Sequence, residues 1–311
     1  MPGPILVAGA INTDLVATVE RAPAAGETVT GRSFAIYGGG KAANQAVAAA
    51  RAGASVAMLG GIGDDDFGHA RLAELAREDI DVSCVAVISG AHSGVALITV
   101  EEGGENRIAY VPGATLGLTP SVCERAFQMA RPAIVLAANE LSTPCLRRLF
   151  SLAREAGARV VFNVAPMSEE ARGLLPLVDV LIVNRGEAAA MAGMPNDRAE
   201  PDQLLGRLQD LGVREPVITL GSDGVIGRAD GVRFRQAALS VDVVDTTGAG
   251  DAFCGVVASR LLLGDPLPEA VRHGVVAGAL ATTRPGAQSS IPTVTEIAAA
   301  LSRLPAVVIG G

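Results

Sequence analysis

Short apolar segments that suit buried strands alternate along this chain with alanine- and leucine-rich segments that suit helices. The strands are expected at residues 5–10, 55–60, 134–137, 159–163, 180–184 and 217–220. The helices are expected at residues 42–52, 67–77, 144–155, 201–211, 251–263, 269–282 and 294–303. This alternation is typical of βαβ units, in which helices cover both faces of a parallel sheet. The sequence therefore predicts one α/β unit rather than an all-helical or all-strand fold.

Two segments interrupt the alternation, at residues 14–37 and 94–111, where Thr, Val and Ile alternate with polar residues and no helix is indicated. We interpret them as antiparallel strands that rise together from one edge of the α/β body. They would form a lid from about residues 12–40 and 93–113. The chain has no internal repeat and no low-complexity linker, so residues 1–311 are interpreted as a single domain.

Composition excludes several classes of function. Hydrophobic residues make up 49% of the chain but aromatic residues only 3%, so the core must consist of Ala, Val, Leu and Ile. The net charge of -8, with no basic run, argues against nucleic acid as the main partner. Apolar stretches fall short of the ~20 residues that a membrane span requires, and no basic leader precedes a long apolar stretch, so a cytoplasmic protein is expected. The four cysteines are scattered without a CxxC pair, which favours reduced thiols over zinc or redox sites.

The strongest indication of a catalytic site is a glycine-rich run that begins at Asp245 and reads DTTGAGDAF. Gly248, Ala249 and Gly250 are placed at the start of a helix, where converging backbone N–H groups and the helix dipole favour an anion. Asp251, in the first turn, puts a carboxylate beside the expected phosphate, where it can accept a proton from an attacking hydroxyl group. The alternative is an ordinary helix N-terminus, since glycine turns and first-turn aspartates are common.

A second glycine-rich run, at residues 38–46, reads GGGKAANQA. It is not a Walker A loop, because Ala42 stands where that motif needs Ser or Thr for magnesium. It is not a dinucleotide fingerprint either, because Lys41 and Asn44 interrupt the glycine spacing. Closely spaced glycines with Lys and Asn suit a polyol, although a solvent-exposed turn is an alternative.

A third segment, at residues 9–14, follows the first expected strand, where ligands of open α/β sheets bind. Asn12 and Asp14 have the spacing that puts two side chains on one face of a strand, from which they could bind vicinal hydroxyl groups. Ordinary turn chemistry is the alternative, since Asn and Asp often end strands.

The DTTGAGDAF run resembles the C-terminal signature of the PfkB-type carbohydrate kinases, the ribokinase family. Three further runs are similar to bacterial ribokinases: GETVTG at 26–31, ANQAVAAARAGA at 43–54 and IGDDDFG at 62–68. The resemblance extends from residue 7 to about residue 292. It implies a ribokinase-like three-layer sandwich with a central, mostly parallel sheet and a small β-strand lid, so that residues 1–311 are one kinase domain.

The same resemblance implies roles for individual residues. Asp251 is the catalytic base, and Gly248, Ala249 and Gly250 form the anion hole. The residues implied to bind the sugar are Asn12, Asp14, Gly39, Gly40, Lys41, Asn44, Glu140 and Asp251. Those implied to bind ATP and arrange Mg²⁺, in part through water, are Asn184, Glu187, Thr219, Leu220, Gly221, Ser222, Asp223, Gly224, Gly250 and Val275. Those implied to hold K⁺, mostly through backbone carbonyls, are Asp245, Thr247, Ala281, Arg284, Gly286 and Ser290.

The chain departs from the usual ribokinase pattern at Ala42, where Gly is typical, and at Thr115 and Cys254, where Asn is typical. These changes leave the sugar open, because small pocket changes alter discrimination by only ~1–3 kcal/mol. The expected reaction is ATP-dependent phosphorylation of D-ribose at its primary 5-hydroxyl group. The alternatives are a PfkB-type kinase for a ketohexose, sugar acid or nucleoside, and a catalytically silent sugar-binding protein. Nucleosides rank below free sugars, because the lid contains few aromatic residues that could form a wall for a base. The exposed edges of the lid strands predict a homodimer.

Overall fold

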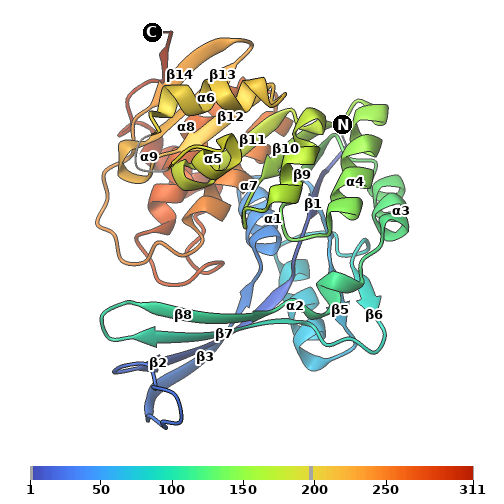
Figure 1. Ribbon diagram of the computed structural model, residues 1–311, viewed down its shortest axis with the longest axis vertical. Coiled ribbons are helices and arrows are strands. Elements are labelled where there is room, and N and C mark those ends of the chain that lie inside the picture. The colour runs from blue at the N-terminus through green and yellow to red at the C-terminus, as the bar shows by residue number, and fades with distance from the viewer. Residues whose placement is uncertain (1–2, 196–198, 311) are drawn as a thin grey trace.

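The computed structural model describes residues 3–195 and 199–310, and it consists of a large twisted sheet between two helical layers, with a smaller sheet projecting from one end (Figure 1). The large sheet has the strand order β15-β14-β13-β12-β11-β10-β9-β1-β4. Its strands are β1 (Ile5–Ala8), β4 (Val56–Leu59), β9 (Ile134–Ala138), β10 (Arg159–Asn163), β11 (Val180–Asn184), β12 (Glu215–Thr219), β13 (Val225–Ala229), β14 (Val232–Gln236) and β15 (Val308–Ile309). Pairing is parallel from β4 to β12 and antiparallel beyond β12.

The helices divide between the two faces of this sheet, and each face has its own apolar core. The first core includes residues of α1 (Lys41–Arg51), α2 (Asp66–Arg77), α7 (Ala249–Leu262), α8 (Leu267–Ala281) and α9 (Val294–Leu301). The second includes residues of α3 (Pro120–Ala130), α4 (Thr143–Ala156), α5 (Arg185–Ala192) and α6 (Pro201–Asp210). Short 3₁₀ turns lie at η1 (Gly113–Gly117), η2 (Glu169–Leu177) and η3 (Gly221–Asp223). The predicted three-layer α/β architecture is thereby confirmed.

Alanine and glycine let the helices of the first core approach closely. Gly255, one turn after Asp251 on α7, is the clearest case, because a Cβ there would lie 2.3 Å from the carbonyl oxygen of Gln45 on α1. The two helices therefore meet backbone to backbone. This contact brings the start of α1 against the start of α7, and so joins two of the runs that the sequence singles out.

The smaller sheet is the predicted lid, with the order β3-β2-β7-β8. Its strands are β2 (Asn12–Val19), β3 (Gly31–Gly39), β7 (Gly94–Glu101) and β8 (Asn106–Val111). The prediction of antiparallel strands is correct for the two hairpins, but the central pair β2 and β7 is parallel. The reason is that each interrupting segment folds into its own hairpin, and the first strands of the two hairpins then pair. A further small pair, β5 (Gly61–Gly63) and β6 (Ala86–Ile88), lies beside η1.

Among residues 3–195 and 199–310, no helix has the length and apolar character needed to cross a membrane.

Candidate active site

The glycine-rich tip of α7 has the shape that the sequence predicts. Gly248 is the N-cap with φ 77°, a left-handed conformation that favours glycine, and the helix begins at Ala249. The N–H of Ala249 already donates to the carbonyl oxygen of Thr246 at 3.3 Å. The N–H groups of Gly248, Gly250 and Asp251 make no hydrogen bond within the described residues. Three donors at a helix N-terminus are thus free for an anion.

Asp251 is almost fully buried, at 7% exposure, and two side-chain amides from α1 fix its carboxylate. Asn44 Nδ2 donates to Oδ2 at 2.9 Å, and Gln45 Nε2 donates to Oδ1 at 3.1 Å. Burial raises the pKa of Asp251, while the charge of Lys41 and the two amide hydrogen bonds lower it. A carboxylate that is oriented but poorly solvated is suited to accept a proton from a hydroxyl group.

Gln45 and Asn163 belong to this site but were not predicted from the sequence. The Nε2 atom of Gln45 also contacts Asn163 Oδ1 at 3.1 Å, and Asn163 Nδ2 donates to the Ile182 carbonyl oxygen at 3.1 Å. These hydrogen bonds connect the Asp251 carboxylate to the end of β10 and the middle of β11. Only the Asn-Gln pair at positions 44 and 45, polar within an alanine-rich helix, hinted at this arrangement.

Glu140, predicted to bind sugar, follows β9 and accepts hydrogen bonds from three backbone N–H groups. Ala10 donates to Oε2 at 2.9 Å, Ala42 to Oε2 at 3.1 Å and Lys41 to Oε1 at 3.0 Å. Burial raises its pKa to about 7, against the opposing effect of these three donors. The carboxylate therefore joins the end of β1 to the start of α1, whatever else it contacts.

Asn12 and Asp14 lie on one face of β2 at the base of the lid, as their spacing predicts. Asn12 is buried, and its Oδ1 atom has no hydrogen-bond partner in the described part of the chain. Burial raises the pKa of Asp14 to about 6, and the nearby charge of Arg71 opposes this shift. Gly39 pairs with Asn12 in the lid, and Gly40 is the N-cap of α1, so the predicted sugar residues converge where the lid meets α1.

A cavity of about 530 Å³ lies beside the α7 tip. The predicted nucleotide residues that line it are Thr219, Gly221, Ser222, Gly224, Gly250 and Val275. Leu220 and Asp223, from the same predicted set, are not part of its lining. Much of the remaining wall is apolar, with Leu239, Val241 and Phe253 among its residues, and such a wall suits a flat heterocycle. Since Gly250 is shared, the cavity opens directly onto the free amides of the tip.

Asn184 and Glu187 form the capping box of α5. Asn184 Oδ1 accepts from the N–H of Glu187 at 2.8 Å, and Glu187 Oε2 accepts from the N–H of Asn184 at 2.8 Å. Burial raises the pKa of Glu187, while its backbone hydrogen bond and the charge of Lys41 lower it. Lys41 thus acts electrostatically on both Glu187 and Asp251. In the part of the chain that the structure describes, no cluster of three His, Cys, Asp or Glu residues could hold a metal ion alone.

The residues implied to hold K⁺ lie in two loops that Asp245 joins and at the end of α8. Its Oδ1 atom accepts from the N–H and hydroxyl groups of Thr247 at 2.9 and 2.7 Å, and Oδ2 accepts from the Gly286 N–H at 2.8 Å. Arg284 instead pairs with Glu296, and the Ser290 hydroxyl group donates to the Ala287 carbonyl oxygen at 2.8 Å. Ala281 is the last residue of α8. Side chains in this region therefore bond both to one another and to backbone groups.

Comparison with known proteins places this arrangement among kinases. The family model described as pfkB family carbohydrate kinase matches residues 4–294. The ribokinase of Haemophilus influenzae is 36% identical over 291 residues, which cover 93% of this chain and 95% of that protein. The deoxyribokinase of Salmonella typhi is 30% identical, covering 94% and 96%. The structure of Arabidopsis thaliana ribokinase complexed with ribose and ATP superposes with a TM-score of 0.89 at 27% identity, covering 97% and 99%.

Proposed function

The chain belongs to the pfkB family of carbohydrate kinases, and on that basis we propose that it transfers the γ-phosphoryl group of ATP to the 5-hydroxyl group of D-ribose. The enzyme is a phosphotransferase with an alcohol group as acceptor. The observation that carries the proposal is the Asp251 carboxylate, held by Asn44 and Gln45 beside the free amides of the α7 tip. The ribokinase relative and the ribokinase complexed with ribose and ATP support ribose as the sugar.

Asp251 is the general base in this proposal. Its carboxylate accepts the proton of the 5-hydroxyl group as the sugar oxygen attacks the γ-phosphorus atom of ATP, and the bond from this atom to the β–γ bridging oxygen breaks to release ADP. The N–H groups of Gly248, Gly250 and Asp251 stabilise the negative charge that the transferred phosphoryl group carries. Lys41 adds a positive charge close to the carboxylate. Asn12, Asp14, Gly39, Gly40, Lys41, Asn44 and Glu140 form the sugar-binding set.

ATP occupies the cavity beside Gly250, with its base against the apolar wall and its phosphates toward the α7 tip. Mg²⁺ would neutralise the phosphate charge when bound. Glu187 fits a role near this ion, because only its Oε2 atom is used for capping and Oε1 makes no hydrogen bond among residues 3–195 and 199–310. Since the described residues of the site offer no metal-binding cluster of acidic side chains, phosphates and water would supply most ligands.

A monovalent cation, K⁺, is proposed to bind between the loops that Asp245 joins, with Thr247, Ala281, Arg284, Gly286 and Ser290 contributing mainly backbone carbonyls. It would hold the loop before α7 in place and so stabilise the anion hole. Replacing a non-binding cation by K⁺ at constant ionic strength is expected to raise kcat. Equal rates in the two salts would exclude this role.

The substrate assignment is tested by measuring ADP release with ribose, 2-deoxyribose, fructose, a keto-deoxy sugar acid and a nucleoside, each with Mg²⁺. Ribose is expected to give the highest kcat/KM, with ribose 5-phosphate as product. A preference for 2-deoxyribose would instead favour the activity of the Salmonella typhi relative. No turnover with any sugar would favour a silent binding protein.

A further inference from the structure

A row of side chains crosses the lid on the face that carries Asp14. In the strand register, Tyr37 on β3 pairs with Asp14 on β2, Asp14 pairs with Ala96 on β7, and Ala96 pairs with Tyr110 on β8. Paired residues of neighbouring strands point to the same face of a sheet. The two tyrosines of the chain therefore flank Asp14, and the small Ala96 separates Asp14 from Tyr110.

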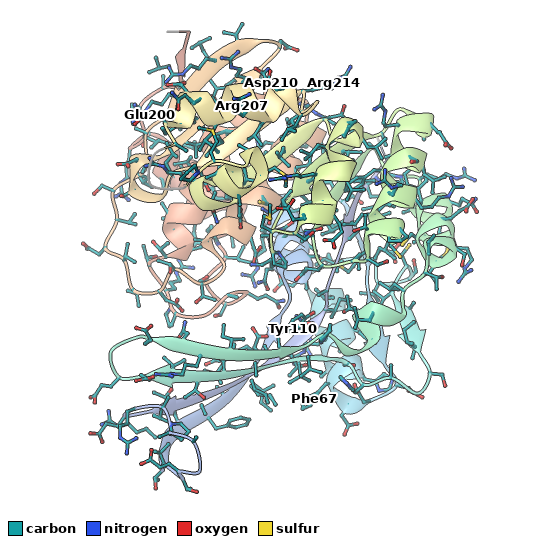
Figure 2. All side chains as sticks on the ribbon, in the orientation of Figure 1. Phe67, Tyr110, Glu200, Arg207, Asp210 and Arg214 are labelled. Atoms are coloured by element: carbon teal, nitrogen blue, oxygen red, sulfur yellow. The ribbon has the colours of Figure 1, made fainter. Side chains whose placement is uncertain are left out.

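Tyr110 lies at the base of the lid, where β8 returns to the α/β body before η1 (Figure 2). Burial raises its pKa, and the charges of Glu140 and Asp14 raise it further, whereas interactions with the Asn12 and Thr115 side chains lower it. Tyr110 is 47% exposed, so its side chain is covered on one side by residues of the proposed sugar site and is open to solvent on the other. Tyr37, at the other end of the row, has no hydrogen bond to any described residue of this site.

Two polar atoms next to Tyr110 lack partners. Asn12 Oδ1 and Thr115 Oγ1 are buried and make no hydrogen bond to any of the described residues. Asn12 is 6% and Thr115 2% exposed, so bulk water does not readily satisfy either side chain. Buried polar atoms without partners are costly, and at a binding site a ligand can supply the missing partner. The three side chains present both hydrogen-bond donors and acceptors to a ligand hydroxyl group.

The position of the Tyr110, Asn12 and Thr115 side chains relative to Asp251 determines which part of the sugar they contact. The 5-hydroxyl group must meet Asp251, whose surroundings are Lys41, Asn44 and Gln45. Tyr110 instead lies on β8 of the lid, in the row that contains Ala96 of β7 and Asp14 of β2. A bound pentose would therefore direct its ring hydroxyl groups, rather than its primary one, toward Tyr110.

We propose that Tyr110, Asn12 and Thr115 form a hydrogen-bonding subsite for a ring hydroxyl group of the sugar, remote from the phosphorylated carbon, and that Tyr110 thereby determines specificity against deoxy sugars. This inference rests on the proposed function and refines it. A site built to bond a hydroxyl group penalises an analogue that lacks it, because its own polar groups then stay unpaired.

The test is the ratio of kcat/KM for ribose to kcat/KM for each of two analogues, 2-deoxyribose and 1,4-anhydroribitol, which lacks the anomeric hydroxyl group. Tyr110→Phe removes the phenol hydroxyl group and keeps the ring. For one of the two analogues, Tyr110→Phe should lower the ratio of ribose to analogue by about threefold to tenfold, because one neutral hydrogen bond to ribose is lost. The loss should appear mainly as a higher KM for ribose. Thr115→Val should lower the same ratio. Tyr37→Phe, the matched control in the same row, should leave both ratios unchanged.

Ratios that stay within about twofold of wild type for both analogues in Tyr110→Phe would overturn the subsite. An equal loss for ribose and both analogues would also overturn it, because a merely structural role lowers all substrates alike. These results differ from a failure of the proposed function, in which wild-type protein would phosphorylate none of the three compounds.

Discussion

Asp251 combines burial with two fixed hydrogen bonds, and these oppose each other in setting its pKa. We expect Asp251→Asn, which removes the proton acceptor with little change in size, to lower kcat by about 10²–10⁴-fold. The KM for ribose should change far less. Steady-state kinetics check this, with the thermal transition confirming that the variant is folded. A kcat within about tenfold of wild type, a loss below ~1.4 kcal/mol, would show that another group is the base.

Gln45 positions the Asp251 carboxylate, and its hydrogen bond shifts the pKa of Asp251 in a known direction. Its amide donates to the carboxylate, which favours the ionised form and lowers the pKa of Asp251. In Gln45→Met the pKa should rise, so the acidic limb of the kcat/KM profile should move to higher pH. Gln128→Met, on the exposed surface of α3, is the matched control and should leave the profile in place. An acidic limb that stays fixed or moves to lower pH in Gln45→Met would contradict the assignment.

The sequence singled out candidate site residues that stand in unusual local patterns, such as the glycines around Asp251 and the polar pair after β1. Gln45 and Asn163 were missed because their meeting joins positions 118 residues apart, which no local spacing reveals. The lid was also interpreted as poor in aromatic residues, although it contains both tyrosines of the chain. Only the strand register shows that Tyr110 shares a face with Asp14.

At the level of elements, the helices and strands were predicted well where the apolar periodicity of the sequence is strong, and less well elsewhere. Helix α5 was missed because its capping box, Asn184 and Glu187, was interpreted only as a nucleotide element. The β13–β14 hairpin was missed too, although Asp230 and Gly231, both with positive φ, form the Asp-Gly turn typical of two-residue hairpins. These strands are short and only partly buried, so they lack the continuous apolar run of the parallel strands.

The junction between β1 and α1 depends on one side chain. Glu140→Gln would place an amide N–H₂ group opposite at least one of the N–H donors of Ala10, Lys41 and Ala42. We expect a loss of about 1–3 kcal/mol in the free energy of unfolding, because a buried donor would lose its acceptor. Urea denaturation measures this. Glu155→Gln, on the exposed end of α4, should stay within about 0.5 kcal/mol of wild type. Equal stability of the two variants would mean that the junction does not need the carboxylate.

At the scale of the whole molecule, the lid leaves an apolar surface and two strand edges uncovered. The edges are β3 and β8, which end the four-stranded order. On the face of the lid opposite Asp14, the exposed fractions of Phe34, Ile36 and Leu97 are 64%, 47% and 51%. Ile36 and Leu97 lie on either side of Leu15 in the strand register. Contiguous exposed apolar side chains of this kind are typical of association surfaces. A second copy of the lid would cover them and protect the edges, which is consistent with the homodimer predicted from the sequence.

Leu97→Glu tests this association directly. A charge on the apolar face should convert a wild-type homodimer into a monomer, because two carboxylates would have to be buried where the lids meet. Sedimentation velocity at micromolar concentration distinguishes the two states. Leu263→Glu is the matched control, since Leu263 is equally exposed, at 55%, but lies at the end of α7 on the α/β body. That variant should remain dimeric. A monomeric wild-type protein, or a Leu97→Glu variant that stays dimeric, would show that the lid face does not join two copies.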